Sequence, residues 1–296
     1  MLRILGTLGG LIWLSAHAAP ANEGDMVILR SGTPVSFAQL VSELAGADII
    51  CVGEQHDHQD GHAFELRLLD AVGRQARGAC LSLEMFERDV QIALDEYLDG
   101  HITESAFLAA ARPWPTYKTD YRPLVEWCKE RRMPVIAANV PRRYVNMVSR
   151  LGQDSLRALP RASRVFLPKL PYSMAVSPAY DRALSDLFGA SHGAAAPGMP
   201  SAENMKAAQG LWDCGMAESI LRAARRMPRR PVIHMCGSMH CERGFGIVER
   251  LRKAARRTKV MTVIVRPTPQ AGQPAPAADL GDFVVTVGAA APPAAP

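Results

Sequence analysis

Short apolar runs recur along the chain, separated by stretches in which apolar and polar residues alternate with a helical period. The runs are rich in Val, Ile, Leu, Ala and Cys, which is typical of strands covered on both faces of a sheet. We predict strands over residues 47–52, 79–85, 134–138, 231–236, 260–265 and 282–287. The last of these follows a connector rich in Pro, Ala and Gln.

The helical stretches between these runs cover residues 62–74, 88–98, 102–111, 121–132 and 245–255. Strands that alternate with helices predict an α/β fold: a mostly parallel β-sheet flanked by helices, with right-handed crossovers. The segment at about 141–228 is too long for one crossover, and it contains further helical patterns over 143–150, 178–188 and 202–226. We therefore expect a helical insertion or lid over the carboxyl edge of the sheet, with a partly flexible Gly/Ala/Pro stretch at 189–200.

The two ends of the chain have their own composition. Residues 1–18 contain Arg3, a short apolar stretch and an Ala-x-Ala sequence, so we predict a signal peptide cleaved after Ala18. The mature protein is then periplasmic or otherwise exported. Residues 19–288 form a single domain in this interpretation, and residues 289–296 form a disordered tail.

Charge and cysteine content exclude some classes of protein. The net charge is +5, but the Lys and Arg residues are scattered and the densest groups fall where helices should end. There they match the helix dipole, so nucleic-acid binding is disfavoured. The six cysteines include no Cys-x-x-Cys pair, and several lie in apolar strands. We expect buried thiols rather than a disulfide, for which Cys236 and Cys241 are the nearest pair.

Polar residues stand at the same end of successive predicted strands. A Gly-x-x-His pattern follows two strands, at Gly53–His56 and at Gly237–His240, and Glu54 lies within the first pattern. Glu84 and Asn139 end the two strands between them. The carboxyl ends of parallel strands share one edge of a sheet, where α/β proteins bind ligands. We expect one crevice that contains Glu54, His56, Glu84, Asn139 and His240.

The residue types in this crevice leave several chemistries open. Two histidines and a carboxylate suit zinc or another divalent metal, so His56, Glu84 and His240 are candidate ligands, with Glu54 to activate water in a hydrolase. A hydrogen-bonded Glu–His network that braces the strand ends is the simpler interpretation. His234 lies within a strand and is expected to be a core histidine. The sequence lacks a G-x-S-x-G elbow and a phosphate-binding Gly loop.

Several motifs occur in one order between residues 47 and 265, and together they resemble the ChaN-like haem-binding protein family. They are Gly53–Asp57 with His62, Leu83–Phe86, Tyr121–Leu124, Ala138–Pro141, Gln209–Ala217, and Gly237–His240 with Gly244 and Gly246. The family belongs to a wider group with paired Gly-x-x-His motifs, which includes Tiki-type metalloproteases and erythromycin esterases. The chain departs from the family pattern at Gly61, where many relatives have His, and it has no Cys for lipid attachment near the predicted cleavage site.

The resemblance implies a non-catalytic protein that binds haem in haem or iron uptake, as a homodimer and with an outer-membrane haem receptor as partner. It implies Tyr121 as the ligand of the haem iron, with Tyr117 as the second choice. Further side chains are expected around the haem: His62, Arg122, Arg142 and Arg143 for the propionates, and Trp114, Trp212 and Met216 as an apolar face. A metal-dependent hydrolase and an interaction module for a membrane receptor are the alternatives.

Overall fold

The computed structural model describes residues 26–175, 177–190, 199–270 and 272–288. The predicted signal peptide at 1–18, most of the Gly/Ala/Pro stretch and the predicted tail lie outside these residues. Within the described ranges no helix is both long enough and apolar enough to span a membrane.

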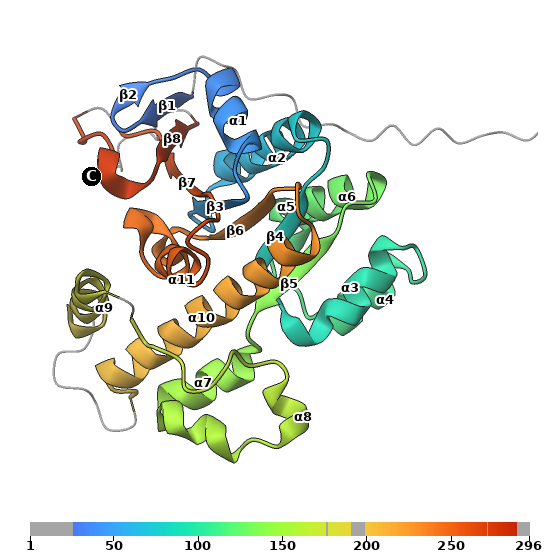
Figure 1. The fold of residues 1–296 in the computed structure, drawn as a ribbon, viewed down its shortest axis with the longest axis vertical. Coiled ribbons are helices and arrows are strands. Elements are labelled where there is room, and N and C mark those ends of the chain that lie inside the picture. Colours follow the sequence, from blue (N-terminus) through green and yellow to red (C-terminus); the bar gives the residue numbers. More distant parts are fainter. Residues whose placement is uncertain (1–25, 176, 191–198, 271, 289–296) are drawn as a thin grey trace, which may run out of the picture.

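One eight-stranded sheet organises the molecule, with the strand order β2-β1-β8-β7-β3-β6-β4-β5 (Figure 1). The six predicted strands are confirmed, and they run parallel to one another. A hairpin at one edge was not predicted, and its strand β1 pairs antiparallel with β8. The strands are β1 (Val27–Arg30), β2 (Thr33–Pro34), β3 (Ile49–Glu54), β4 (Cys80–Glu87), β5 (Val135–Asn139), β6 (Val232–Gly237), β7 (Val260–Pro267) and β8 (Phe283–Val287).

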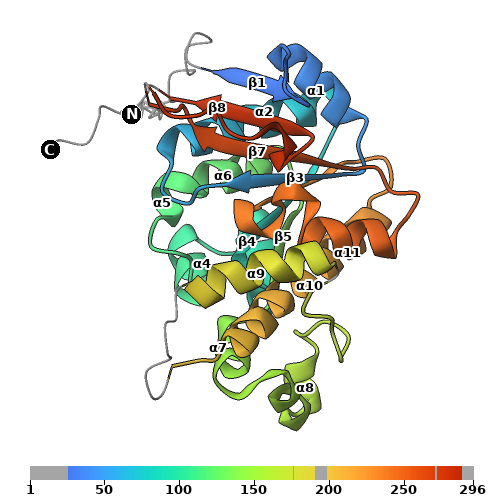
Figure 2. The ribbon, with the colours of Figure 1, turned by 90° about the vertical axis from the view of Figure 1, so that its left-hand side faces the viewer.

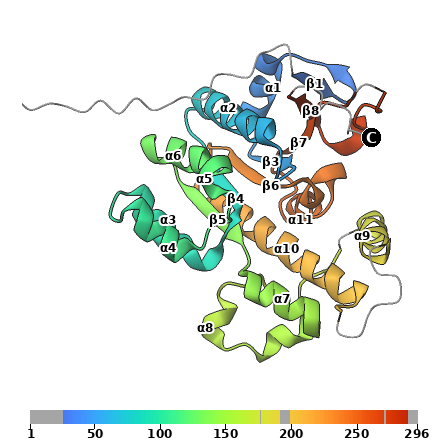
Figure 3. The same ribbon diagram turned by 180° about the vertical axis from the view of Figure 1, so that it is seen from behind.

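Alternate residues of each central strand face opposite layers of helices. On β3, Ile50 and Val52 belong to the larger hydrophobic core, whereas Ile49 and Cys51 belong to the core on the other face. Figure 3 shows the helices of the first layer. They are α1 (Phe37–Ala45), α2 (Gln59–Gln75), α3 (Gln91–Leu98), α4 (Glu104–Ala111), α5 (Tyr117–Asp120) and α6 (Arg122–Glu130). Since both faces are buried, the strands can be apolar throughout.

The second face is covered by α10 (Ala202–Arg226) and α11 (Ile247–Ala254). Met216 and Ile220 of α10 are fully buried in this core. The second half of α10 is therefore the crossover helix that leads from the insertion back to β6, and Met216 is a core residue rather than an exposed apolar face.

The predicted helical insertion after β5 is present (Figure 2), and side chains within it form a third, smaller core. It contains α7 (Arg142–Leu151), α8 (Arg161–Arg164), α9 (Pro178–Ala190) and the first half of α10. Ser201 caps α10 by accepting a hydrogen bond from the backbone N–H of Asn204. Short 3-10 helices lie at Arg88–Val90, Gln153–Ala158, Ser238–His240, Glu242–Gly244 and Ala278–Leu280.

All six cysteines are free thiols, and five of them are buried. Cys236 and Cys241 are not bonded to each other. Burial raises the pKa of Cys80 to about 12, which keeps this thiol protonated. These cysteines act as small core residues, as the sequence predicts.

Candidate functional site

The carboxyl ends of three adjacent strands bring the predicted polar residues to one edge of the sheet. Strand β6 lies between β3 and β4, so Glu54 at the end of β3 is paired with Gly237 at the end of β6. In β4 the pairing with β5 shifts register between Leu83 and Glu87, and Glu84 lies in this irregular segment. Such a bulge turns a side chain away from the regular strand direction. The Glu84 carboxylate accepts the backbone N–H of Gly237 at 2.8 Å.

The two motif glycines allow the close approach of neighbouring segments. A Cβ atom on Gly53 would lie 2.7 Å from Cys241 Sγ and 2.9 Å from Ser238 Cα. A Cβ atom on Gly237 would lie 2.9 Å from Nε2 of His56. The Gly-x-x-His pattern therefore has a steric cause: each glycine makes room for the other motif.

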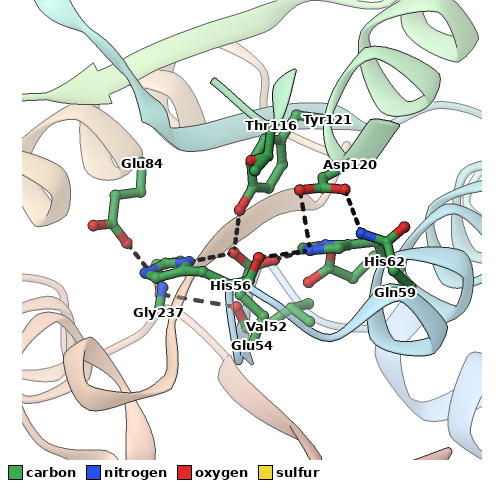
Figure 4. Close-up of polar contacts among 12 residues, drawn as sticks. Val52, Glu54, His56, Gln59, His62, Glu84, Thr116, Asp120, Tyr121 and Gly237 are labelled. Carbon is green, nitrogen blue, oxygen red and sulfur yellow. Dashed lines mark hydrogen bonds and ion pairs between the residues drawn. The ribbon is translucent and has the colours of Figure 1, made fainter. Parts of the chain in front are cut away.

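Glu54 lies at the centre of a buried hydrogen-bond network (Figure 4). Its Oε1 atom accepts the Tyr121 hydroxyl at 2.7 Å and is 2.6 Å from Nδ1 of His56. Its Oε2 atom is 3.2 Å from Nδ1 of His62, which is also 3.1 Å from Oε2 of Glu65. One carboxylate thus connects two histidines and a tyrosine.

The network combines ionised groups with protonated ones. Burial would raise the pKa of Glu54, but hydrogen bonds from His56, His62 and Tyr121 hold it well below its ordinary value. Burial likewise opposes the charge on His62, yet Glu54 and Glu65 raise the pKa of His62 to about 11. Burial and the neighbouring charge of Glu54 raise the pKa of Glu65 well above its ordinary value.

His56 is the member of the network that reaches solvent. Its side chain is 45% exposed, whereas those of Glu54 and His62 are 1% and 4% exposed. The Trp114 ring packs edge-on against its imidazole with 4.9 Å between ring centroids, and the Arg142 guanidinium lies 6.0 Å from the Trp114 ring. Met239, in the second motif, is also exposed. The hydrogen bond to Glu54 is the main cause of a raised His56 pKa.

His240 forms a second buried network beside the first. Its Nδ1 atom is 2.6 Å from Asp213 Oδ1 on α10, and its Nε2 atom is 3.4 Å from Glu84 Oε1. The Tyr180 hydroxyl donates to Asp213 at 2.6 Å. Burial would raise the pKa of Glu84, but His240 and the Gly237 N–H lower it to about 2. Glu84 and His240 form an ion pair within the protein.

The predicted haem residues occupy different environments. Tyr121 is fully buried and donates its hydroxyl to Glu54, so an iron atom reaches its oxygen only if that hydrogen bond breaks. The Tyr117 ring lies in the core near Phe86, and its hydroxyl has no hydrogen-bond partner among the described residues. His62 lies behind His56 and is buried.

The arginines predicted to bind propionates, and the remaining predicted polar residues, also make contacts in different parts of the structure. Arg122 forms a bidentate pair with Glu104, and Arg143 pairs with Asp89 at 2.6 Å. Arg142 is exposed beside Trp114. The side-chain Oδ1 of the buried Asn139 accepts the backbone N–H of Val140, and Trp212 packs against His240 with 6.2 Å between ring centroids. His234 is a core histidine, 2.9 Å from the Ser82 hydroxyl.

The predicted metal ligands do not converge on one point. Among the described residues, a different group could hold a metal ion: one ligand atom each of Glu54, His62 and Glu65 lies within 4.8 Å of the others. His56, Glu84 and His240 form no such group. Glu65 was not predicted as a site residue, although its position three residues after His62 places both side chains on one face of α2. Asp213 was also not predicted as a site residue, although it lies within the Gln209–Ala217 motif.

Comparisons with known proteins identify the family of the chain. A model of the family described as haem-binding uptake, Tiki superfamily, ChaN matches residues 40–251. The structure of ChaN of Campylobacter jejuni with cofacially bound haem is similar over 90% of this chain and 98% of that chain, with a TM-score of 0.68 and 19% identity. A succinoglycan biosynthesis protein aligns with a TM-score of 0.50 and 12% identity over 83% of this chain and 73% of its own.

A curated relative is similar over a shorter stretch. The chloroplastic protein RETICULATA-RELATED 5 of Arabidopsis thaliana is 26% identical over 129 residues, which are 41% of this chain and 17% of that protein. The family model covers well over half of the chain, and its matched residues include both Gly-x-x-His motifs. The chain therefore belongs to the haem-binding uptake family of the Tiki superfamily, the family of ChaN.

Proposed function

We propose that this protein binds haem at the carboxyl edge of the sheet, with His56 as the side chain that coordinates the iron. The observation that carries the proposal is the position of His56: its imidazole is exposed, and its Nδ1 atom is 2.6 Å from the Glu54 carboxylate. A histidine that binds a metal through one ring nitrogen usually donates the other N–H to a carboxylate or carbonyl oxygen. Glu54 supplies this oxygen, which leaves Nε2, the ring nitrogen on the side of Gly237, for the iron.

The surroundings of His56 fit a haem. Trp114 provides an aromatic surface beside the imidazole, and the exposed Arg142 provides a positive charge for a propionate. The other two predicted arginines are already paired within the protein, Arg122 with Glu104 and Arg143 with Asp89. When bound, haem supplies a ferric iron that accepts one nitrogen lone pair. In this proposal Tyr121, the ligand predicted from the family resemblance, does not bind the iron but donates a hydrogen bond to Glu54.

The wider role follows the family. We propose that the mature protein is exported and takes part in haem or iron uptake without catalysing a reaction, and that an outer-membrane haem receptor is a partner. The Campylobacter jejuni relative binds haem cofacially. A site on an open edge suits haem held between two copies of the chain, so we propose a homodimer in the haem-bound state.

Titration with hemin tests this function. The wild-type protein should develop a Soret band distinct from that of free hemin, and His56→Ala should weaken binding at least about 10-fold. Arg122→Ala is the matched surface control, because Arg122 is paired with Glu104, and it should bind like the wild type. A saturated wild-type spectrum equal to that of free hemin refutes the function. A band that survives in His56→Ala but is lost in Tyr121→Phe refutes the ligand assignment and favours Tyr121.

A hydrolase is the second candidate, because an exposed imidazole backed by a carboxylate is also the arrangement of a general base. His56 would accept the proton of a water molecule, and Glu54 would hold the imidazolium. A chromogenic ester such as p-nitrophenyl acetate tests this activity. Turnover that disappears in His56→Ala supports hydrolysis, and turnover equal to the rate without protein refutes it.

A further inference from the structure

We propose that Glu54, His62 and Glu65 form a binding site for one divalent transition-metal ion of the zinc type, separate from the haem. The three side chains come from two elements, the end of β3 and the first turns of α2. One ligand atom of each lies within 4.8 Å of the others, and all three residues are buried. Two carboxylates and one imidazole are ligands that zinc and related ions accept.

The two measured distances between ligand atoms are close to those around a tetrahedral ion. Bonds of about 2.0–2.2 Å to zinc place neighbouring ligand atoms about 3.4 Å apart. The Nδ1 atom of His62 is 3.2 Å from Oε2 of Glu54 and 3.1 Å from Oε2 of Glu65. These atoms therefore need only small movements to share an ion.

Unpartnered oxygen atoms provide an independent indication. Oε1 of Glu65 and Oδ2 of Asp120 are buried and have no hydrogen-bond partner among the described residues. Asp120 comes from α5 and points at His62, with 3.8 Å between Oδ2 and Nε2. Buried polar atoms without partners are rare and call for a bound species. A divalent cation at these ligands would displace the protons that His62 and Glu65 carry in the metal-free protein, so binding should release protons.

The groups that would orient the ligands are already in place. Nε2 of His62 is 3.2 Å from the backbone oxygen of His56, so it can donate its N–H there and leave Nδ1 for the metal. Oε1 of Glu54 is occupied by Tyr121 and His56, which leaves Oε2 toward the site. Such outer partners fix the orientation of metal ligands.

Titration of the haem-free, chelator-treated protein with Co²⁺ tests the site, because tetrahedral Co²⁺ gives visible d–d bands. We expect one Co²⁺ per chain, displaced by one equivalent of Zn²⁺, and a rise of the unfolding temperature with Zn²⁺. Glu65→Gln keeps the shape of the side chain and should weaken Co²⁺ binding more than about 100-fold, because the loss of an outer partner alone costs 10–100-fold. Asp70→Asn, on the same helix, is the control and should bind like the wild type.

Two results would overturn the metal site. The first is wild-type protein that gives no stoichiometric d–d bands, and the second is Co²⁺ binding that survives in both Glu65→Gln and His62→Gln. Circular dichroism of each metal-free variant shows whether it folds. Because no haem is present in the assay, a failed hemin titration leaves this result unaffected.

Discussion

The two buried tyrosines near the site predict opposite responses to the loss of one hydroxyl group. Tyr121 donates to the ionised Glu54 at 2.7 Å, whereas the Tyr117 hydroxyl is buried without a partner among the described residues. Replacement of either residue by Phe leaves the ring in place and creates almost no cavity. The two substitutions therefore compare a satisfied hydroxyl with an unsatisfied one.

The expected magnitudes follow from the contacts. A hydrogen bond to a charged group contributes about 1.5–3 kcal/mol, so Tyr121→Phe should lower the free energy of unfolding by about 2 kcal/mol. An unsatisfied buried hydroxyl costs about 1–3 kcal/mol, so Tyr117→Phe should leave stability unchanged or raise it. For a chain of this size, a loss of about 2 kcal/mol lowers the unfolding temperature by about 4 °C.

Urea unfolding followed by circular dichroism measures both effects on matched samples. The difference in unfolding free energy between the two variants should be at least about 2 kcal/mol. Equal stability of Tyr121→Phe and wild type would show that the hydroxyl of Tyr121 is not bound to an ionised Glu54. A destabilised Tyr117→Phe would show that its hydroxyl has a partner.

Three further predictions concern the glycine contact, the exposed arginine and the buried core histidine. Gly237→Ala should weaken hemin binding about 10-fold in a Soret titration, because the new Cβ would lie 2.9 Å from Nε2 of His56 and displace the imidazole; unchanged binding would argue against the steric role of the motif. Arg142→Ala should weaken hemin binding and reduce its dependence on salt, whereas Arg122→Ala should change neither, and equal effects would remove the distinction between the two. Burial lowers the pKa of His234 to about 4, against about 6.5 in the unfolded chain. The folded protein therefore favours neutral His234, and its full stability from this residue is present above pH 6.5. This contribution of about 3 kcal/mol is lost as the pH falls from 6.5 to 4. Urea unfolding at several pH values should show this slope in the wild type and a weaker slope in His234→Gln; identical slopes would contradict it.

The parallel strands were predictable because each is a continuous apolar run covered by helices on both sides. The predicted run 260–265, for example, is observed as Val260–Pro267. The hairpin of β1 and β2 was missed because its strands have only four and two residues, although Met26–Leu29 is a short apolar run. Its position is decided by pairing with β8, more than 250 residues later in the sequence.

The polar residues at the strand ends were predictable for the same reason, since strand direction alone brings Glu54 and Glu84 to one edge. The residues that pair with the polar groups of the site could not be predicted. Asp213 reaches His240 from α10, and Asp120 reaches His62 from a four-residue helix. These contacts depend on how helices pack across the sheet, which local periodicity does not encode. The burial of Tyr121 also depends on segments distant in the sequence, because its hydroxyl donates to Glu54 and its ring packs edge-on against His62 of α2.

A crystal structure of the haem complex would show which side chain binds the iron. It should show haem at the carboxyl edge beside Trp114, with the iron bonded to Nε2 of His56 and with Tyr121 still hydrogen-bonded to Glu54. An iron bonded to the Tyr121 oxygen, or haem bound on another face of the molecule, would contradict the assignment of His56 as the ligand.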